Sequence, residues 1–195
     1  MIVAVFGGSF NPPHVAHVLA SALVLTTHEI DRLLVVPTFQ HPFPKALAPY
    51  DDRVTMCELA MAWLPRVEVS RVEAELGGES RTLRTLEHLA AKHPDWKMRL
   101  VIGADILLES TKWFAFDRIC ALAPPIVLGR TGIVGAAAPE PLLPDVSSTE
   151  VRSMIAEGRA NELELLVPRD VLAHISAKAL YRHAASEAGT ASSGT

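Results

Sequence analysis

Short runs of apolar residues alternate along the chain with longer stretches in which apolar positions recur every three or four residues. The short runs are typical of strands buried on both faces, and they lie at residues 2–6, 33–36, 67–69, 99–102 and 126–128. The periodic stretches predict helices at about residues 14–27, 51–64, 82–92, 106–108, 116–122, 148–157 and 168–178. Strands that alternate with helices predict an α/β protein with a doubly wound parallel sheet.

Two of the predicted strands end in glycine, at Gly7-Gly8 and at Gly103. If the strand order is 3-2-1-4-5, these two ends are neighbours in the crevice where doubly wound sheets bind their ligands. The pattern predicts a single domain over residues 1–183, with helices at its carboxyl end. Residues 184–195 are small and polar, and we expect a disordered tail there.

Composition narrows the classes of partner. Hydrophobic residues make up 49% of the 195 residues, which supplies a sizeable core. Lys and Arg number 18 against 22 Asp and Glu, so the net charge is −4. An acidic chain argues against sequence-independent binding of nucleic acid, which needs a basic face. A few local donors can still hold a small anionic substrate.

Neither the cysteines nor the amino end indicates export. Cys57 and Cys120 are too few for a disulfide framework or a structural zinc site, and we expect both to be reduced core thiols. The amino end lacks the basic region of a signal peptide. The apolar run at residues 15–25 is interrupted by His17 and is too short to span a bilayer. We expect a cytoplasmic protein without a membrane partner, and a homo-oligomer remains open.

The residues that follow the first strand combine several groups suited to phosphate. Gly7 and Gly8 let backbone N–H groups approach a ligand closely. The next helix directs its free N–H groups and the positive end of its dipole at the same place. His14 and His17 are three residues apart and share one face of its first turn. A zinc site is the weaker alternative because no third ligand is evident nearby, and the lysine of a Walker A loop is absent.

Four segments carry a resemblance to a known family. Residues 7–17 resemble the signature of the HxGH nucleotidyltransferases, and residues 147–152 resemble that superfamily's second motif, ISSTxxR. Residues 103–113, with Gly-Ala-Asp, Leu-Leu and Lys-Trp, resemble a feature typical of bacterial nicotinate-nucleotide adenylyltransferases. Residues 171–182 resemble the end of the same family. The resemblance implies a Rossmann-like fold over nearly the whole chain.

The resemblance also implies a reaction. The expected substrates are ATP and nicotinate mononucleotide, and the products are deamido-NAD and pyrophosphate, formed by direct in-line transfer. Mg²⁺ is expected on the triphosphate, held mainly by phosphate oxygens and water, with no metal ligand from the protein. Nicotinamide mononucleotide, phosphopantetheine or another phosphorylated acceptor remain alternatives, as does a nucleotide-binding protein without turnover.

Roles for individual residues follow from the matched motifs. The resemblance implies that His14, His17 and Arg152 act on the phosphates and on the transition state. The expected contacts to ATP come from Gly7, Gly8, Ser9, Phe10, Lys45, Asp105, Ser147, Ser148 and Thr149. The expected contacts to the acceptor come from Arg81, Thr82 and Trp113.

Simpler interpretations remain open for several of these residues. Ser147 and Asp105 are also good helix caps, and Ser147 with Glu150 forms a capping box. Without the resemblance, core packing is the preferred interpretation of Trp113, and a solvated surface position fits Lys45 equally well.

The chain departs from the family's pattern at three places. Ala16 replaces the glycine between the two histidines, and Arg81 replaces a tyrosine. The loop usually written Pro-Pro-His-Lys is His-Pro-Phe-Pro-Lys at residues 41–45. Arg81 adds a cation near the expected acceptor, which favours a carboxylate over an amide if its side chain points inward.

Overall fold

Five parallel strands form the centre of the molecule. The structure is a computed structural model and describes residues 1–108, 113–129 and 139–182. The strands lie in the order β3-β2-β1-β4-β5, as the sequence predicts. Their bounds are β1 (Ile2–Gly8), β2 (Arg32–Pro37), β3 (Val67–Val69), β4 (Lys97–Gly103) and β5 (Pro125–Leu128).

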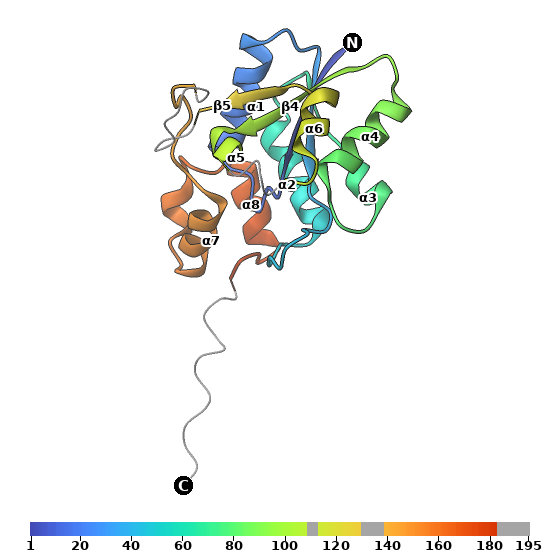
Figure 1. Cartoon of the computed structure of the whole chain (residues 1–195). Helices are drawn as coiled ribbons and strands as arrows, with labels where there is room; N and C mark the ends of the chain where they lie inside the picture. Colours follow the sequence, from blue (N-terminus) through green and yellow to red (C-terminus); the bar gives the residue numbers. More distant parts are fainter. Residues whose placement is uncertain (109–112, 130–138, 183–195) are drawn as a thin grey trace.

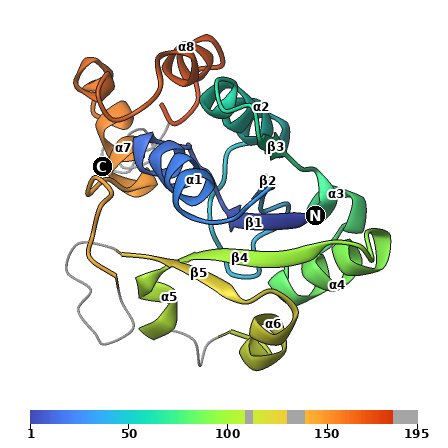
Figure 2. The same ribbon diagram turned by 90° about the horizontal axis from the view of Figure 1, so that it is seen from above.

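Helices cover both faces of this sheet (Figures 1 and 2). One layer contains α1 (Val15–Thr27), α2 (Tyr50–Met61), α7 (Ser148–Ala156) and α8 (Arg169–Ala177). The opposite layer contains α3 (Val72–Leu76), α4 (Thr82–Lys92), α5 (Ala104–Leu108) and α6 (Phe116–Leu122). A short 3₁₀ helix (Ala160–Leu163) joins α7 to α8. The predicted single sheet with helices on both faces is confirmed.

Alternation along the central strands explains their continuous apolar runs. Val3 and Val5 of β1 face the layer of α4, whereas Ala4 between them faces the layer of α1. In β2, Leu33 faces the α1 layer and Leu34 the α4 layer. Successive side chains of a strand point to opposite faces, so a strand covered on both sides must be apolar at every position.

Most predicted helix bounds agree with the structure to within a few residues. The 11-residue helix α4 and the helix α6 coincide with their predictions. Two short elements were not predicted, α3 and the 3₁₀ helix. The expected tail at residues 184–195 lies outside the described residues, and the domain boundary at residue 183 stays a prediction.

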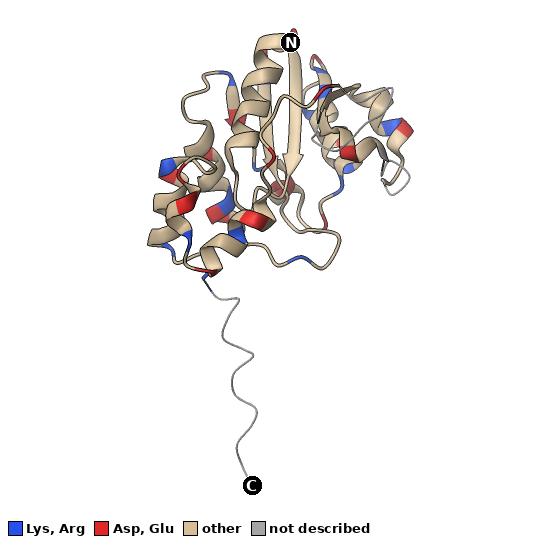
Figure 3. Ribbon diagram, turned by 90° about the vertical axis from the view of Figure 1, so that its left-hand side faces the viewer, with Lys and Arg blue, Asp and Glu red and all other residues tan. Residues whose placement is uncertain are grey.

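Other predictions concern the thiols and the membrane. Cys57 is buried, which raises the pKa of its thiol, and Cys120 is half-buried; both are free. No helix in the described ranges is long and apolar enough to cross a bilayer. Acidic and basic residues are interspersed over the helices and loops seen in Figure 3.

The winding of the sheet reverses at β1. The chain moves from β1 outward to β2 and β3, and then crosses to β4 on the other side of β1. The connections after β1 and β4 therefore leave in opposite directions, and a crevice opens between the carboxyl ends of these neighbouring strands. The glycine-ended strands of the sequence are the two that meet there, as predicted.

We predict that the layer beneath α4 contributes strongly to stability. Leu86 of α4 has no exposed surface, so Leu86→Ala should lower the free energy of unfolding by about 2–5 kcal/mol through lost burial and a residual cavity. Leu165 is 89% exposed and provides the control, because Leu165→Ala should change that free energy by less than about 0.5 kcal/mol. Urea unfolding of the two variants tests this, and equal losses would contradict it.

Candidate active site

The turn after β1 brings two imidazoles together at the start of α1. His14 precedes the first residue of this helix, and its backbone N–H donates to Nδ1 of His17 at 3.2 Å. The two ring centroids are 3.8 Å apart, and the ring of Phe10 lies 5.0 Å from that of His17. A Cβ atom at Gly8 would lie 3.2 Å from the ring of Phe10, so this packing favours glycine. The sequence prediction that both histidines share one face is confirmed.

The amino end of α7 docks on the same turn. The hydroxyl of Ser148 donates to the backbone carbonyl of Pro12 at 2.9 Å. Arg152 donates through Nη1 to the carbonyl of Asn11 at 2.9 Å, and through Nη2 to the hydroxyl of Thr149 at 3.3 Å. Two segments more than 130 residues apart in sequence thus form one surface of backbone donors, imidazoles and a guanidinium.

Ser147 acts as the cap of α7. Its hydroxyl oxygen accepts a hydrogen bond from the backbone N–H of Glu150 at 3.2 Å, as the capping interpretation predicts. The interaction satisfies one of the free donors at the start of the helix and leaves the remaining ones directed at the turn. A contact of Ser147 to a nucleotide therefore stays a prediction.

A second cation joins this surface from the proline-rich loop. Lys45 donates from Nζ to the hydroxyl of Ser9 at 3.3 Å. Burial lowers the pKa of Lys45, and the nearby charges of Arg152 and Arg53 lower that pKa further. The chain is acidic as a whole, but this site concentrates positive charge, which suits a polyanionic ligand.

Next to these groups lies a pocket of about 360 Å³ that contains the three predicted acceptor residues. One wall is the turn at residues 7–9, and the other wall includes Arg81, Thr82 and Trp113. Trp113 packs edge-to-face against Phe116, with 6.0 Å between ring centroids. The guanidinium of Arg81 forms a half-exposed ion pair with Glu79 at 2.9 Å.

Asp105 reaches the same sheet edge from β4. It is the second residue of α5, which begins directly after Gly103 at the carboxyl end of that strand. Since β4 is the neighbour of β1, Asp105 lies at the same edge of the sheet as the turn after β1, but it does not line the 360 Å³ pocket.

Buried polar residues that the sequence analysis did not single out support the turn. The side-chain amide of Asn11 donates to the carbonyl of Ala46 at 3.2 Å, and its oxygen accepts from the N–H of Ala48 and from the hydroxyl of Tyr181, both at 2.9 Å. Burial raises the pKa of Tyr181. Asn11 lies inside the matched motif, but the partners come from distant segments that no local pattern indicates.

Arg53 and Glu73 were not predicted either, because their partners also lie in other segments of the chain. Arg53 is buried in α2 and donates to the carbonyl of Ser9. Glu73 of α3 lines the 360 Å³ pocket, accepts from the N–H of Phe39 and the hydroxyl of Thr85, and has a pKa raised by burial. One feature of the sequence could have identified Arg53. It is a charged residue four positions before Cys57, on the buried face of a helix.

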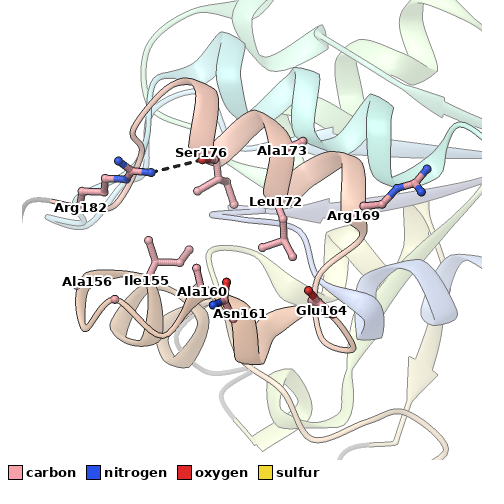
Figure 4. A pocket seen from close by; sticks show the side chains of 12 residues that line it. Ile155, Ala156, Ala160, Asn161, Glu164, Arg169, Leu172, Ala173, Ser176 and Arg182 are labelled. Carbon is pink, nitrogen blue, oxygen red and sulfur yellow. Dashed lines mark hydrogen bonds between the residues drawn. The ribbon is translucent and has the colours of Figure 1, made fainter.

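A larger hollow lies elsewhere, between α8 and the segment formed by α7 and the 3₁₀ helix (Figure 4). Its volume is about 900 Å³, and Leu172 and Ile155 face each other across it, with Arg169 and Arg182 at its ends. None of the predicted site residues lines it, so volume alone does not identify the reactive site.

The arrangement at the sheet edge suits anions better than a protein-bound metal ion. Among the described residues, no three His, Cys, Asp or Glu side chains are grouped so that they could hold a metal. The converging groups are N–H donors and cations, which bind phosphate oxygens.

Comparison with known proteins agrees with this geometry. The family model described as cytidylyltransferase-like matches residues 5–154. A protein of Anaeromyxobacter sp. (strain K), named a probable nicotinate-nucleotide adenylyltransferase, is 49% identical over 186 residues, which cover 92% of this chain and 96% of that protein. A protein of Myxococcus xanthus with the same name is 40% identical and covers 92% of this chain and 94% of its own length.

A solved structure shows the same fold. The nicotinic acid mononucleotide adenylyltransferase of Plasmodium falciparum, complexed with NaAD, superimposes with a TM-score of 0.80 at 17% identity, covering 92% of this chain and 97% of that one. The family match spans most of the chain, and the named relatives span nearly all of it. The chain therefore belongs to the cytidylyltransferase-like family and, within it, to the nicotinate-nucleotide adenylyltransferases, which are nucleotidyltransferases.

Proposed function

We propose that this chain transfers the adenylyl group of ATP to nicotinate mononucleotide, giving deamido-NAD and pyrophosphate. One observation carries the proposal: the turn at residues 7–9 is shared by a cationic phosphate surface and by a pocket lined with Trp113 and Thr82. A donor triphosphate and a ring-bearing acceptor can therefore meet at a single turn. The names of the relatives and of the solved structure support the same reaction.

The transfer is a displacement at one phosphorus atom. A phosphate oxygen of the mononucleotide attacks the α-phosphorus of ATP and forms the new P–O bond. The bond from that phosphorus to the bridging oxygen of the β-phosphate breaks, and pyrophosphate leaves with the electron pair. The protein's part is to align the two anions and to stabilise the negative charge that develops.

The positions of the histidines and of Arg152 support a role for them in this alignment. His14 and His17 lie at the start of α1, where N–H donors and the helix dipole converge. Arg152 and Lys45 approach the same turn from α7 and from the proline-rich loop. We assign the imidazoles to the transferred phosphate, and the two cations to the pyrophosphate end.

Contacts to the nucleoside and to the acceptor follow from position. We assign Asp105 to the ribose of ATP because it follows the carboxyl end of β4, and Ser148 and Thr149 to the phosphates because they open α7. Trp113 is assigned to stacking on the pyridine ring. Thr82 is the first residue of α4, so backbone N–H groups there suit a carboxylate.

The nucleotide enters as its magnesium complex in this proposal. The residues at the turn are donors and cations, so the ion is held by phosphate oxygens and water rather than by side chains. When bound, Mg²⁺ would offset part of the negative charge on the triphosphate, and the residues of the chain would orient the triphosphate.

We predict that purified protein releases pyrophosphate from ATP when nicotinate mononucleotide is supplied. The site presents donors to the ring substituent, and a buried donor left unmatched is costly. We therefore expect a higher kcat/KM with nicotinate mononucleotide than with nicotinamide mononucleotide or phosphopantetheine. A coupled pyrophosphate assay across these acceptors measures this.

Each other outcome of that panel has a definite meaning. A preference for another acceptor would contradict the proposed substrate while leaving adenylyl transfer intact. Binding of ATP without turnover on any acceptor would contradict catalysis altogether.

The second prediction for this reaction concerns the imidazole of His17. If it stabilises the transition state, His17→Ala should lower kcat by roughly 10²–10³-fold while the melting temperature stays close to that of wild type. His28 is exposed at the other end of α1, and His28→Ala is the matched control, with kcat unchanged. Unchanged kcat in His17→Ala would remove this residue from the mechanism.

The third prediction concerns pH. The pKa of Lys45 is lowered, so its ammonium loses its proton at a lower pH than an ordinary lysine. Its attraction for ATP is present below that pKa and is lost as pH rises through it, so kcat/KM for ATP should fall on the alkaline side. In Lys45→Arg the guanidinium stays charged, and the fall should shift to higher pH or disappear. Identical profiles for wild type and Lys45→Arg would exclude Lys45 as the titrating group.

A further inference from the structure

Arg53 carries a buried guanidinium that lies behind the turn at residues 7–9. It lies in the first turn of α2 with 1% of its surface exposed, on the same helix face as the core residues Cys57 and Ala60. Its Nη1 donates to the carbonyl of Ser9 at 2.9 Å, and its Nε donates to the carbonyl of Ala48 at 3.0 Å. One side chain thus joins the turn to the proline-rich loop.

The partners of this cation are neutral. No carboxylate of the described residues lies within ion-pair distance of the Arg53 guanidinium. Carbonyl oxygens accept from Nε and Nη1 of Arg53 without cancelling its charge, and burial lowers the pKa of Arg53. The carboxylate of Glu73 interacts with this charge electrostatically without forming an ion pair with it, and burying a charge without an ion pair is costly. This cost indicates a role that an apolar side chain could not supply.

The backbone in front of Arg53 is held in an uncommon conformation. Phe10 has φ of +44°, in the left-handed region that non-glycine residues rarely adopt. Such conformations persist where the surroundings determine them, and they cluster at functional sites. The peptide before Phe10 is the one whose carbonyl Arg53 binds.

That hydrogen bond fixes the direction of an N–H group. In a trans peptide the C=O and the N–H point in opposite directions. The carbonyl of Ser9 points to Arg53, so the N–H of Phe10 points away from α2. No hydrogen-bond acceptor within residues 1–108, 113–129 and 139–182 is paired with this N–H.

We propose that Arg53 is a positioning residue for ATP: it holds the Ser9 carbonyl from behind so that the Phe10 N–H is directed at a phosphate of the nucleotide. This inference rests on the proposed function. Arg53 does not touch the substrate itself.

The second hydrogen bond extends the role to the loop. By holding Ala48, Arg53 fixes the chain three residues beyond Lys45, whose Nζ reaches the hydroxyl of Ser9. The side chain of Asn11 ties the same loop to the turn through Ala46 and Ala48. These hydrogen bonds hold the loop against the turn, so that Lys45 lies beside the segment that carries the Phe10 N–H.

A second arginine that binds two backbone carbonyls makes the proposal testable, although its side chain is exposed and that of Arg53 is buried. Arg66 also donates to two backbone carbonyls, those of Ile30 and Leu25, but it lies just before β3 at the amino ends of the strands. Arg66→Met removes the same kind of hydrogen bonds far from the nucleotide. Arg53→Met removes the positioning contact, and Arg53→Lys keeps a positive charge while it loses the planar fork.

Binding should separate the variants. We expect Arg53→Met to bind α,β-methylene-ATP about tenfold more weakly than wild type, the scale of one misaligned donor to a charged group. Arg53→Lys should be weakened as well, although it keeps the charge. Arg66→Met should bind like wild type. Isothermal titration calorimetry at a temperature where all variants are folded, checked by circular dichroism, gives these constants without any need for turnover.

Three results would overturn the inference. In the first, Arg53→Met binds the analogue with an affinity within twofold of that of Arg66→Met. In the second, Arg53→Lys binds the analogue as tightly as wild type, which would assign the effect to charge alone. If Arg53→Met does not fold, Arg53→Lys decides. The third is a wild-type chain that binds no analogue, which also ends the proposed function; a wild type that binds it but transfers nothing ends the proposed function alone.

Discussion

The site depends on one contact, between the amino end of α7 and the turn that follows β1. Ser148 and Arg152 donate to the carbonyls of Pro12 and Asn11, which closes the crevice at the reversal of the sheet. The contact uses the backbone carbonyls of Pro12 and Asn11 and does not involve the imidazoles of His14 and His17. Without it, the turn and the amino end of α7 would not form one continuous surface.

A local concentration of positive charge distinguishes this crevice from the rest of an acidic molecule. Lys45, Arg53 and Arg152 lie close enough for their charges to lower the pKa of Lys45, which is an unfavourable arrangement in the absence of an anion. A bound triphosphate turns that repulsion into attraction. The repulsion among these cations lowers the stability of the fold, and its relief on binding would contribute to the free energy of binding. This is a common compromise between the function of a site and the stability of the fold.

The fold and the motifs were predictable because their signals are local. Continuous apolar strands, glycine at two strand ends and helical periodicity determine the layers and indicate the strand order, and the family motifs place His14, His17 and Arg152. Arg53 and the bond between Tyr181 and Asn11 were not predicted, since Arg53 binds Ser9 at 44 positions away and Tyr181 binds Asn11 at 170 positions away. Such hydrogen bonds form only where the fold brings distant segments together, so they produce no periodic pattern in the sequence. The short helix α3 escaped because five residues are too few to show a period.

The hydrogen bond from Tyr181 to Asn11 has a consequence for the order in which the molecule is made. Asn11 is synthesised 170 residues before Tyr181, so its side-chain oxygen acquires this donor only after the strands between them have been made. All five strands can pair before that moment, because the last of them ends at Leu128. A nascent chain can therefore hold its sheet while its nucleotide site lacks the final support. A chain that stops before Tyr181 therefore lacks this support of the turn after β1.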